Sequence, residues 1–501
     1  MRSNDIVIGF NGKLELNEIK QKFAKIVGDT PIIFVNFHNP DNGFGGITTV
    51  YKSIKKNKMN LSVVYRTDSP NSSGSKKRQC VYINDKLNFF YQKIYGKSYL
   101  WPLLHGMRTN LSKNDVLRGR RATVNASIIF ADKIIYTGNM LKNTVEDKPI
   151  YWINDYLLIH VASILREKEP LSQIILSIRS AFDFNKKKRM FREDIIMLLQ
   201  GMCASNFISF HRQRDVECFL KLLNEYQHLL DSDIKINWNR NIVTVGDRIV
   251  TPRAIPMGND PYYRRQLSYD SKTKEFMKYL KSLVSNRNII SSISSFEVNK
   301  GIKEELDIIE KLFHRNSSLI ENYVFVRVMP VRKNYDDLPI YKKLRGDVLS
   351  RIEQINIKYG KNGLVPIITF LDPNGFEDYQ VAALQKISKI YLVLSLADGF
   401  NHSGIEFLLT KSKEDDPGLL IASDVGASDY LGSNLKRISP KRTTESAIFI
   451  EKLLSMSSDR ISENQESLIK AANNLSSFHW TLSILSSIIR PTLVPKWRFD
   501  E

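Results

Sequence analysis

Short apolar runs recur along the first half of the chain, and stretches with helical spacing of apolar residues separate them. The runs cover residues 30–37, 60–67, 126–132, 173–178, 206–211 and 248–258. Runs of this kind, rich in Val, Ile and Phe, are typical of strands that are buried on both faces of a parallel sheet. Because helical patterns separate them, the sequence predicts a doubly wound sheet with helices on both faces.

The same alternation begins again after the polar segment MGNDPYYRRQL at residues 257–267. The second set of apolar runs covers residues 288–294, 322–330, 365–371, 389–396 and 418–423. A chain of 501 residues is also too long for one ordinary hydrophobic core. We therefore expect an α/β protein with two Rossmann-like, doubly wound domains facing each other across a cleft, at residues 1–257 and 258–473.

The last part of the chain carries a helical pattern of its own. Residues 474–489, NLSSFHWTLSILSSII, place apolar side chains at the spacing of an α-helix. We expect a helix within residues 474–501, and we expect it to pack back on the first domain.

Basic residues outnumber acidic residues by a wide margin. The chain has 73 Lys and Arg against 53 Asp and Glu, which gives a net charge of +20. Basic clusters at residues 52–58, 74–79, 118–121 and 184–192 all lie in the first half, so that half is the expected surface for an anion. Nucleic acid, an acidic membrane surface and phosphorylated sugars are compatible partners, and a solvated basic face explains the same composition without any ligand.

Several classes of protein and of site do not fit the sequence. No stretch reaches the roughly 18 consecutive apolar residues of a membrane-spanning helix, and the N-terminus has no apolar core of signal length. We therefore expect a cytoplasmic protein, with a peripheral position at a membrane surface as the alternative. The three cysteines have no metal-ligand spacing, so neither disulfides nor zinc are expected. Walker A, G-x-S-x-G and H-E-x-x-H motifs are missing, and we expect neither a bound metal nor a cofactor.

Seven motifs follow one another along nearly the whole chain. They are FGGITT (44–49), YLWPLLH (99–105), YWINDYLLIHVASILRE (151–167), CASNFISFHRQRDVECFL (203–220), VMPVRKNYDDLPIYKKLRGDV (328–348), LADGFNHSGIEFL (396–408) and LIASDVGASDYLG (420–432). In this order the sequence resembles the trehalose-6-phosphate synthase family, glycosyltransferase family 20, whose members are retaining enzymes with the two-domain GT-B fold. The resemblance implies transfer of a sugar from a nucleoside-diphosphate donor, with a UDP-sugar as first guess. The implied acceptor is anionic: a sugar phosphate, a polysaccharide or a lipid-linked intermediate.

The resemblance also implies a set of donor-binding positions. Lys300 matches the lysine that holds the donor diphosphate, and a glycine pair lets the backbone approach a phosphate closely. Asp398 matches a carboxylate at the donor sugar and is a catalytic candidate, while Glu406 matches the carboxylate that holds the nucleotide ribose. The donor-binding residues implied in this way are Gly45, Gly46, Lys300, Gly399, Asn401 and Glu406.

The acceptor side is implied by the same motifs. Family members grip the phosphate of the acceptor sugar with arginine, tyrosine and tryptophan side chains. The corresponding positions in this chain are His38, Tyr91, Trp101 and Arg332, with His38 at the position of an arginine. Asp155 keeps the carboxylate of the family's Trp-x-His-Asp-Tyr segment and is the second catalytic candidate.

Three family positions carry different residues in this chain. Ser295 stands where the family has an arginine near the diphosphate lysine, Ser177 replaces a donor-contacting histidine, and Asn154 replaces the histidine before Asp155. Arg179, two residues after Ser177, is placed to supply charge from another direction. Besides the retaining transferase, three functions remain open: a DNA-modifying glycosyltransferase, a pseudo-glycosyltransferase with a non-sugar substrate, and an inactive relative that binds nucleotide sugars.

Overall fold

The computed structural model describes residues 30–41, 61–70, 77–141, 148–184, 190–331, 338–372, 376–412 and 415–489, together with residues 21, 48, 51, 72, 74, 75 and 335. The chain forms two compact units. The first consists of residues 1–258 and 477–501, and the second consists of residues 259–476. The observed division thus falls after residue 258, where the sequence placed a boundary after residue 257.

A nine-stranded sheet forms the centre of the first unit, as far as the structure describes it. The strand order is β3-β2-β1-β4-β5-β6-β9-β8-β7. The strands are β1 (Ile32–Asn36), β2 (Leu61–Thr67), β3 (Arg78–Tyr82), β4 (Ile150–Asn154), β5 (Gln173–Ser177), β6 (Phe207–Phe210), β7 (Ile234–Asn237), β8 (Ile242–Val245) and β9 (Arg248–Ala254). Neighbouring strands from β3 to β9 pair in parallel, and β7 and β8 add an antiparallel edge.

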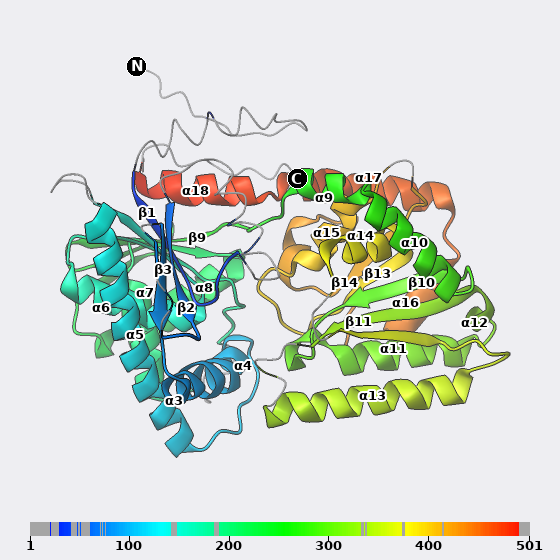
Figure 1. Cartoon of the computed structure of the whole chain (residues 1–501), viewed down its shortest axis with the longest axis horizontal. Helices are drawn as coiled ribbons and strands as arrows, with labels where there is room; N and C mark the ends of the chain where they lie inside the picture. The colour runs from blue at the N-terminus through cyan, green and yellow to red at the C-terminus, as the bar shows by residue number, and fades with distance from the viewer. Residues whose placement is uncertain are drawn as a thin grey trace. The chain divides into compact units, whose positions relative to one another are not determined.

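Helices cover both faces of this sheet (Figure 1). They are α3 (Asp85–Asn88), η1 (Phe89–Leu100), α4 (Trp101–Leu104), α5 (Lys113–Leu141), η2 (Tyr156–Leu158), α6 (Ile159–Lys168), α7 (Arg192–Cys203), α8 (Gln213–Tyr226), η4 (Gln227–Leu229) and α18 (Ser477–Ile489). Side chains alternate along β1, so that Ile33 and Val35 share a core with α5 to α8. On the other face, Phe34 shares a separate core with Trp480 of α18.

One apolar run of the first half is not a strand. Residues 126–132 lie inside α5 (Lys113–Leu141), where Ala126, Phe130 and Ile134 are fully buried at the four-residue spacing of a helix. The interpretation of this run as a strand was wrong, because a short apolar run has the same composition in a buried strand and in a buried helix.

The second unit repeats the design with a six-stranded parallel sheet in the described residues. Its strand order is β12-β11-β10-β13-β14-β15. The strands are β10 (Asn288–Ile293), β11 (Tyr323–Pro330), β12 (Ile367–Asp372), β13 (Ser388–Val393), β14 (Leu419–Ala422) and β15 (Lys436–Arg437). The helices are α9 (Pro261–Ser268), α10 (Ser271–Leu283), η5 (Val298–Lys300), α11 (Ile302–Arg315), α12 (Leu319–Asn322), α13 (Pro339–Tyr359), α14 (Asp378–Ile387), α15 (His402–Thr410), η6 (Gly426–Tyr430), α16 (Thr443–Leu454) and α17 (Ser458–Asn474).

Two separate cores flank the strands of the second unit. Ile290 and Phe325 pack with α11, α13 and α16, whereas Ile289 and Val324 pack with α10 and α14. Helices therefore cover both faces of each parallel sheet, which confirms the predicted class of two Rossmann-like, doubly wound domains. No helix within the described ranges has both the length and the apolar character needed to cross a membrane.

Candidate functional site

In the second unit, a tight turn joins the end of β10 to α11. The turn ends at Gly301, whose φ is +66° and where a Cβ atom would lie 2.2 Å from the carbonyl oxygen of Leu394. Only glycine fits such a position, because a side chain would meet both the backbone of β13's exit and the penalty of the left-handed conformation. The turn therefore presses Lys300 and the first residues of α11 against the loop that follows β13.

Lys300 meets three residues of that loop. Its Nζ lies 2.6 Å from Oδ2 of Asp398, and the same oxygen accepts hydrogen bonds from Ser395 Oγ at 3.0 Å and from Asn401 Nδ2 at 3.0 Å. Lys300, Asp398 and Asn401 were predicted from separate motifs, and the structure brings them together. Ser395 was missed, because its role depends on a loop conformation that spacing alone does not reveal.

The N-terminus of α11 adds an anion-binding element beside Lys300. Gly301 is the N-cap and provides no side-chain hydrogen bond, so the first N–H groups of the helix lack the usual cap. Asn299 fixes the neighbouring loop, since its carbonyl accepts from Leu396 N at 2.8 Å and its Nδ2 donates to Ala397 O at 2.9 Å. A lysine next to an uncapped helix N-terminus is suited to bind phosphate oxygens.

A buried ion pair anchors the same helix from below. Arg327 on β11 is fully buried and pairs with Glu305 in the first turn of α11, and it donates to Ser292 Oγ at 2.8 Å and Ser294 Oγ at 2.6 Å. Burial raises the pKa of Glu305, and Arg327 opposes that rise. Because Glu305 balances its charge inside the core, Arg327 does not replace the arginine that Ser295 displaces.

Glu406 lies on α15 and is held by two residues near the start of the second unit. Its Oε1 accepts from Arg264 Nη2 at 2.5 Å and from Asn259 Nδ2 at 3.3 Å. Sequence reasoning assigned neither residue to the site, because MGNDPYYRRQL was interpreted only as the boundary between two sets of strands. Gly399 is buried in the preceding turn, and Asn401 caps α15 by accepting from Ser403 N at 3.2 Å.

In the first unit, polar residues gather where β1, β4 and β5 end. Asp155 follows β4 with a φ of +75°, and its Oδ2 lies 3.1 Å from Nη2 of Arg179. The same guanidinium contacts Asn36 Oδ1 at 3.4 Å, and Asn36 Nδ2 donates to the carbonyl of His38 at 2.6 Å. The structure thus joins Asp155 and His38 through Arg179, which the sequence had marked only by its charge.

The two substituted histidine positions of this unit are committed to the core. Ser177 is 1% exposed and its Oγ accepts from Trp152 Nε1 at 2.9 Å. Asn154 is fully buried and its Nδ2 donates to Val35 O at 3.1 Å. Neither side chain is directed at a ligand, so these substitutions remove contacts rather than supply new ones.

The remaining acceptor candidates have different positions. Tyr91 is fully buried, its hydroxyl donates to Leu157 O at 2.6 Å, and burial raises its pKa. It is therefore a core residue and does not belong to the acceptor site. Trp101 is partly exposed, with Lys97 Nζ 4.1 Å from the centre of its ring system and the His105 ring at 4.1 Å. Gly45, Gly46 and Arg332 lie outside the described residues.

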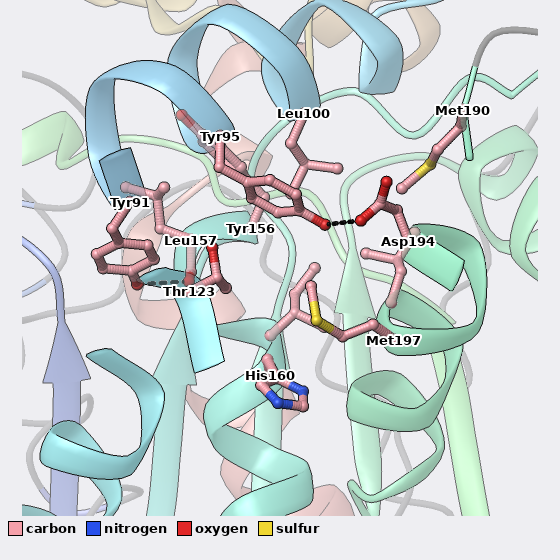
Figure 2. Close-up of a pocket in the computed structure, with 12 residues that line it drawn as sticks. Tyr91, Tyr95, Leu100, Thr123, Tyr156, Leu157, His160, Met190, Asp194 and Met197 are labelled. Carbon is pink, nitrogen blue, oxygen red and sulfur yellow. Dashed lines mark hydrogen bonds between the residues drawn. The ribbon is translucent and has the colours of Figure 1, made fainter. Parts of the chain in front are cut away.

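A small pocket lies beneath η1, next to Tyr91 and Tyr95 (Figure 2). Its volume of about 20 Å³ holds one water molecule. Asp194 accepts from Tyr95 and Tyr99 at 2.8 Å each and from Arg120 Nε at 2.6 Å, so its carboxylate is satisfied. Burial lowers the pKa of His160 at the same pocket. The pocket is too small and too well satisfied to be a sugar site.

The candidate site contains no recognisable metal centre in the described ranges. No group of three or more His, Cys, Asp or Glu side chains there has the arrangement of a metal site. The cations at the two strand-end clusters are instead Lys300, Arg264 and Arg179.

Comparison with known proteins gives one family. The model of Glycosyltransferase family 20 matches residues 39–490. The alpha,alpha-trehalose-phosphate synthase (UDP-forming) A of Dictyostelium discoideum is 24% identical over 415 residues, 81% of this chain and 52% of that protein. The alpha,alpha-trehalose-phosphate synthase (UDP-forming) of Encephalitozoon cuniculi is 25% identical over 405 residues, 80% of each chain. The chain therefore spans about half the length of the first relative.

Solved structures share the fold at lower sequence identity. An E. coli structure bound with UDP-2-fluoro glucose has a TM-score of 0.79 at 18% identity and covers 92% of this chain and 99% of its own. A Burkholderia xenovorans synthase in complex with glucose-6-phosphate has a TM-score of 0.75 at 17% identity, covering 90% and 98%. The N-terminal domain of a Candida albicans trehalose-6-phosphate phosphatase has a TM-score of 0.81 at 18% identity, covering 96% and 98%.

Proposed function

Because the chain belongs to glycosyltransferase family 20, we propose that it transfers a sugar with retention from a UDP-sugar to a hydroxyl of a phosphorylated sugar. The observation that carries this proposal is the cluster of Lys300, Asp398 and Asn401 at the N-terminus of α11. These residues lie at the carboxyl ends of β10 and β13, the edge of a parallel sheet at which doubly wound proteins bind nucleotides.

On the donor side, the diphosphate lies at the start of α11. Lys300 Nζ and the first N–H groups of the helix bind its oxygens, and they stabilise the charge that develops as the bond to the anomeric carbon breaks. Asp398 then accepts hydrogen bonds from hydroxyls of the donor sugar, with Gly399 and Asn401 shaping the turn. Glu406 accepts from the ribose.

On the acceptor side, the attacking hydroxyl approaches the anomeric carbon from the face that the diphosphate leaves. A new carbon–oxygen bond forms, the diphosphate departs with the electron pair, and the hydroxyl proton leaves with it. Asp155, held by Arg179, positions the acceptor sugar, and His38, Trp101 and Arg332 supply its phosphate contacts. The relative bound with glucose-6-phosphate supports a sugar phosphate as acceptor.

The proposed reaction uses no metal ion. Lys300 and the helix N-terminus together supply the positive charge that a divalent cation supplies in other nucleotide-sugar enzymes. We expect turnover to be unchanged when EDTA is added to the assay.

The test is a binding screen followed by a transfer assay. UDP-, GDP-, ADP- and CMP-sugars are compared by the shift that each gives in the unfolding temperature, and the donor that binds is incubated with glucose-6-phosphate. We expect UDP release and a product with retained anomeric configuration by NMR. Lys300→Ala should lower kcat/KM by about 100-fold or more, since it removes a charge-assisted contact to the leaving group. Donor binding without release of UDP in the presence of any sugar phosphate would overturn the proposed reaction.

A second candidate is a nucleotide-sugar-binding relative without turnover. Ser177 favours it, because this side chain is bound to Trp152 and cannot supply the lost histidine contact. The two functions differ in the transfer assay: both bind the donor, and only the enzyme releases UDP.

A further inference from the structure

The geometry points to Arg264 as a positioning residue that sets the orientation of Glu406 and thereby the selectivity for the nucleotide ribose. This inference rests on the proposed function, because Glu406 is the residue proposed to bind the ribose. No motif of the sequence assigns a role to Arg264.

Arg264 is held in place by the helix that carries it. It lies on α9, whose N-terminus is capped by Asp260 through hydrogen bonds from Tyr262 N at 3.1 Å and Tyr263 N at 3.0 Å. Its side chain is 6% exposed, and Nη2 reaches Glu406 Oε1. A short, capped helix leaves such a side chain little freedom, so the guanidinium is a fixed point against which Glu406 is aligned.

The remaining nitrogens of Arg264 show that the residue is placed for Glu406. Nε and Nη1 are buried and have no hydrogen-bond partner in the described part of the chain. Leaving two buried donors unpaired is unfavourable, so packing alone gives no reason to keep an arginine here. Burial acts to lower the pKa of Arg264, but Glu406 and Asp378 more than offset it, and the net pKa is raised. The side chain therefore stays charged beside Glu406.

The ion pair also selects which oxygen of Glu406 meets a ligand. Both protein contacts, from Arg264 and from Asn259, go to Oε1. Oε2 accepts no hydrogen bond within the described residues, and the Glu406 side chain is 16% exposed. An ionised carboxylate anchored at one oxygen presents the other in a fixed direction, which suits a hydroxyl of a ribose diol and gives nothing to a deoxyribose that lacks it.

The test compares UDP with 2′-deoxy-UDP by calorimetric titration. We expect the wild-type protein to prefer UDP by about tenfold, the value of one hydrogen bond to a charged group. Arg264→Met should reduce this preference to about twofold or less, and Arg264→Lys should give an intermediate value. The matched control is Arg265→Gln, because Arg265 lies on the same helix, is exposed and contacts Asn473 instead. It should leave the preference unchanged.

The outcomes separate this inference from the proposed function. A protein that binds UDP but keeps its tenfold preference in both Arg264 variants would overturn the positioning role and leave the donor site intact. A wild-type protein that binds no nucleoside diphosphate would overturn the donor site and, with it, this inference. Thermal unfolding of each variant identifies loss of folding, and in that case the Lys variant decides. Adding Glu406→Gln to Arg264→Met should reduce the preference no further, since the two changes act on one contact.

Discussion

Arg179 is the residue at which this chain departs most usefully from its family pattern. It occupies a position two residues after the substituted Ser177, and it pairs with Asp155 at 3.1 Å. Asp155 has a positive φ of +75°, a conformation that a non-glycine residue keeps only when its surroundings enforce it. The ion pair is one of those restraints, and the lost histidine contact has therefore been replaced by an indirect one.

This arrangement predicts a specific kinetic defect. Arg179→Ala should lower kcat/KM for the acceptor by about 10- to 100-fold, because Asp155 loses its partner and its fixed position. UDP affinity, measured by calorimetry, should stay within twofold of wild type. Arg240→Ala, at an exposed turn of the same unit, is the control. An unchanged acceptor kcat/KM in the Arg179 variant would show that the pair is only structural.

Lys411 gives a pH dependence of stability. It is 5% exposed, its Nζ donates to the carbonyls of Lys386 at 2.6 Å and Asp416 at 3.0 Å, and burial lowers its pKa from 10.5 to about 7. Between these two values the unfolded chain binds more protons than the folded chain, so the free energy of unfolding rises with pH. Below pH 7 both states are protonated, and the cost of burying the charge is fully present.

Lys411→Met should remove this dependence. We expect the variant to be more stable than wild type at pH 6, by on the order of 3 kcal/mol, and to lose the part of the pH 6 to pH 9 rise that Lys411 causes. Urea denaturation at both pH values measures the difference. Lys361→Met is the control, because that lysine is 64% exposed. Parallel curves for wild type and Lys411→Met would contradict the assignment.

At the scale of elements, the turn before α11 fixes both a strand end and a helix terminus. Gly301→Ala should destabilise the protein by about 1–3 kcal/mol, because the new Cβ meets Leu394 O and the left-handed φ adds strain. It should also weaken UDP binding, since α11 must move away from the β13 loop. Two glycines separate these effects: Gly363 has a φ of +75° in open space, and Gly346 is helical in open space. Urea denaturation should rank the alanine variants at 301, 363 and 346 from least to most stable, and equal stability of the first two would remove the steric argument.

Most elements were predictable because buried parallel strands are apolar throughout. Strand β3 (Arg78–Tyr82) was missed, since it is an edge strand with polar residues, and residues 126–132 were assigned to a strand because their run is too short to show a helical period. The twelve-residue π-helix η1 (Phe89–Leu100) has no signature in the pattern of apolar residues. Residues close in sequence, such as Asp398 and Asn401, were found from their motif. The contacts of Arg264 and Asn259 with Glu406 span more than 140 positions and could not be.

At the scale of the whole molecule, the chain returns to its first unit after completing its second. Helix α18 closes one face of the first sheet, where Trp480 is fully buried and its ring centre lies 5.2 Å from that of Trp152. Trp152 in turn donates to Ser177, at the end of β5. The last helix of the chain thus supports the strand ends that carry Asp155 and Arg179, although it contributes no residue to them.

This support predicts that a change far from the donor residues affects one unit more than the other. Trp480→Ala should cost the first unit about 3–5 kcal/mol, because it leaves a large cavity beneath β1 and β4. UDP affinity should remain within about threefold of wild type, since Lys300, Asp398 and Glu406 belong to the second unit with its own core. Urea denaturation and calorimetry measure the two quantities, with Ser487→Ala on the same helix as control. A loss of nucleotide binding equal to the loss of stability would mean that the two cores do not fold independently.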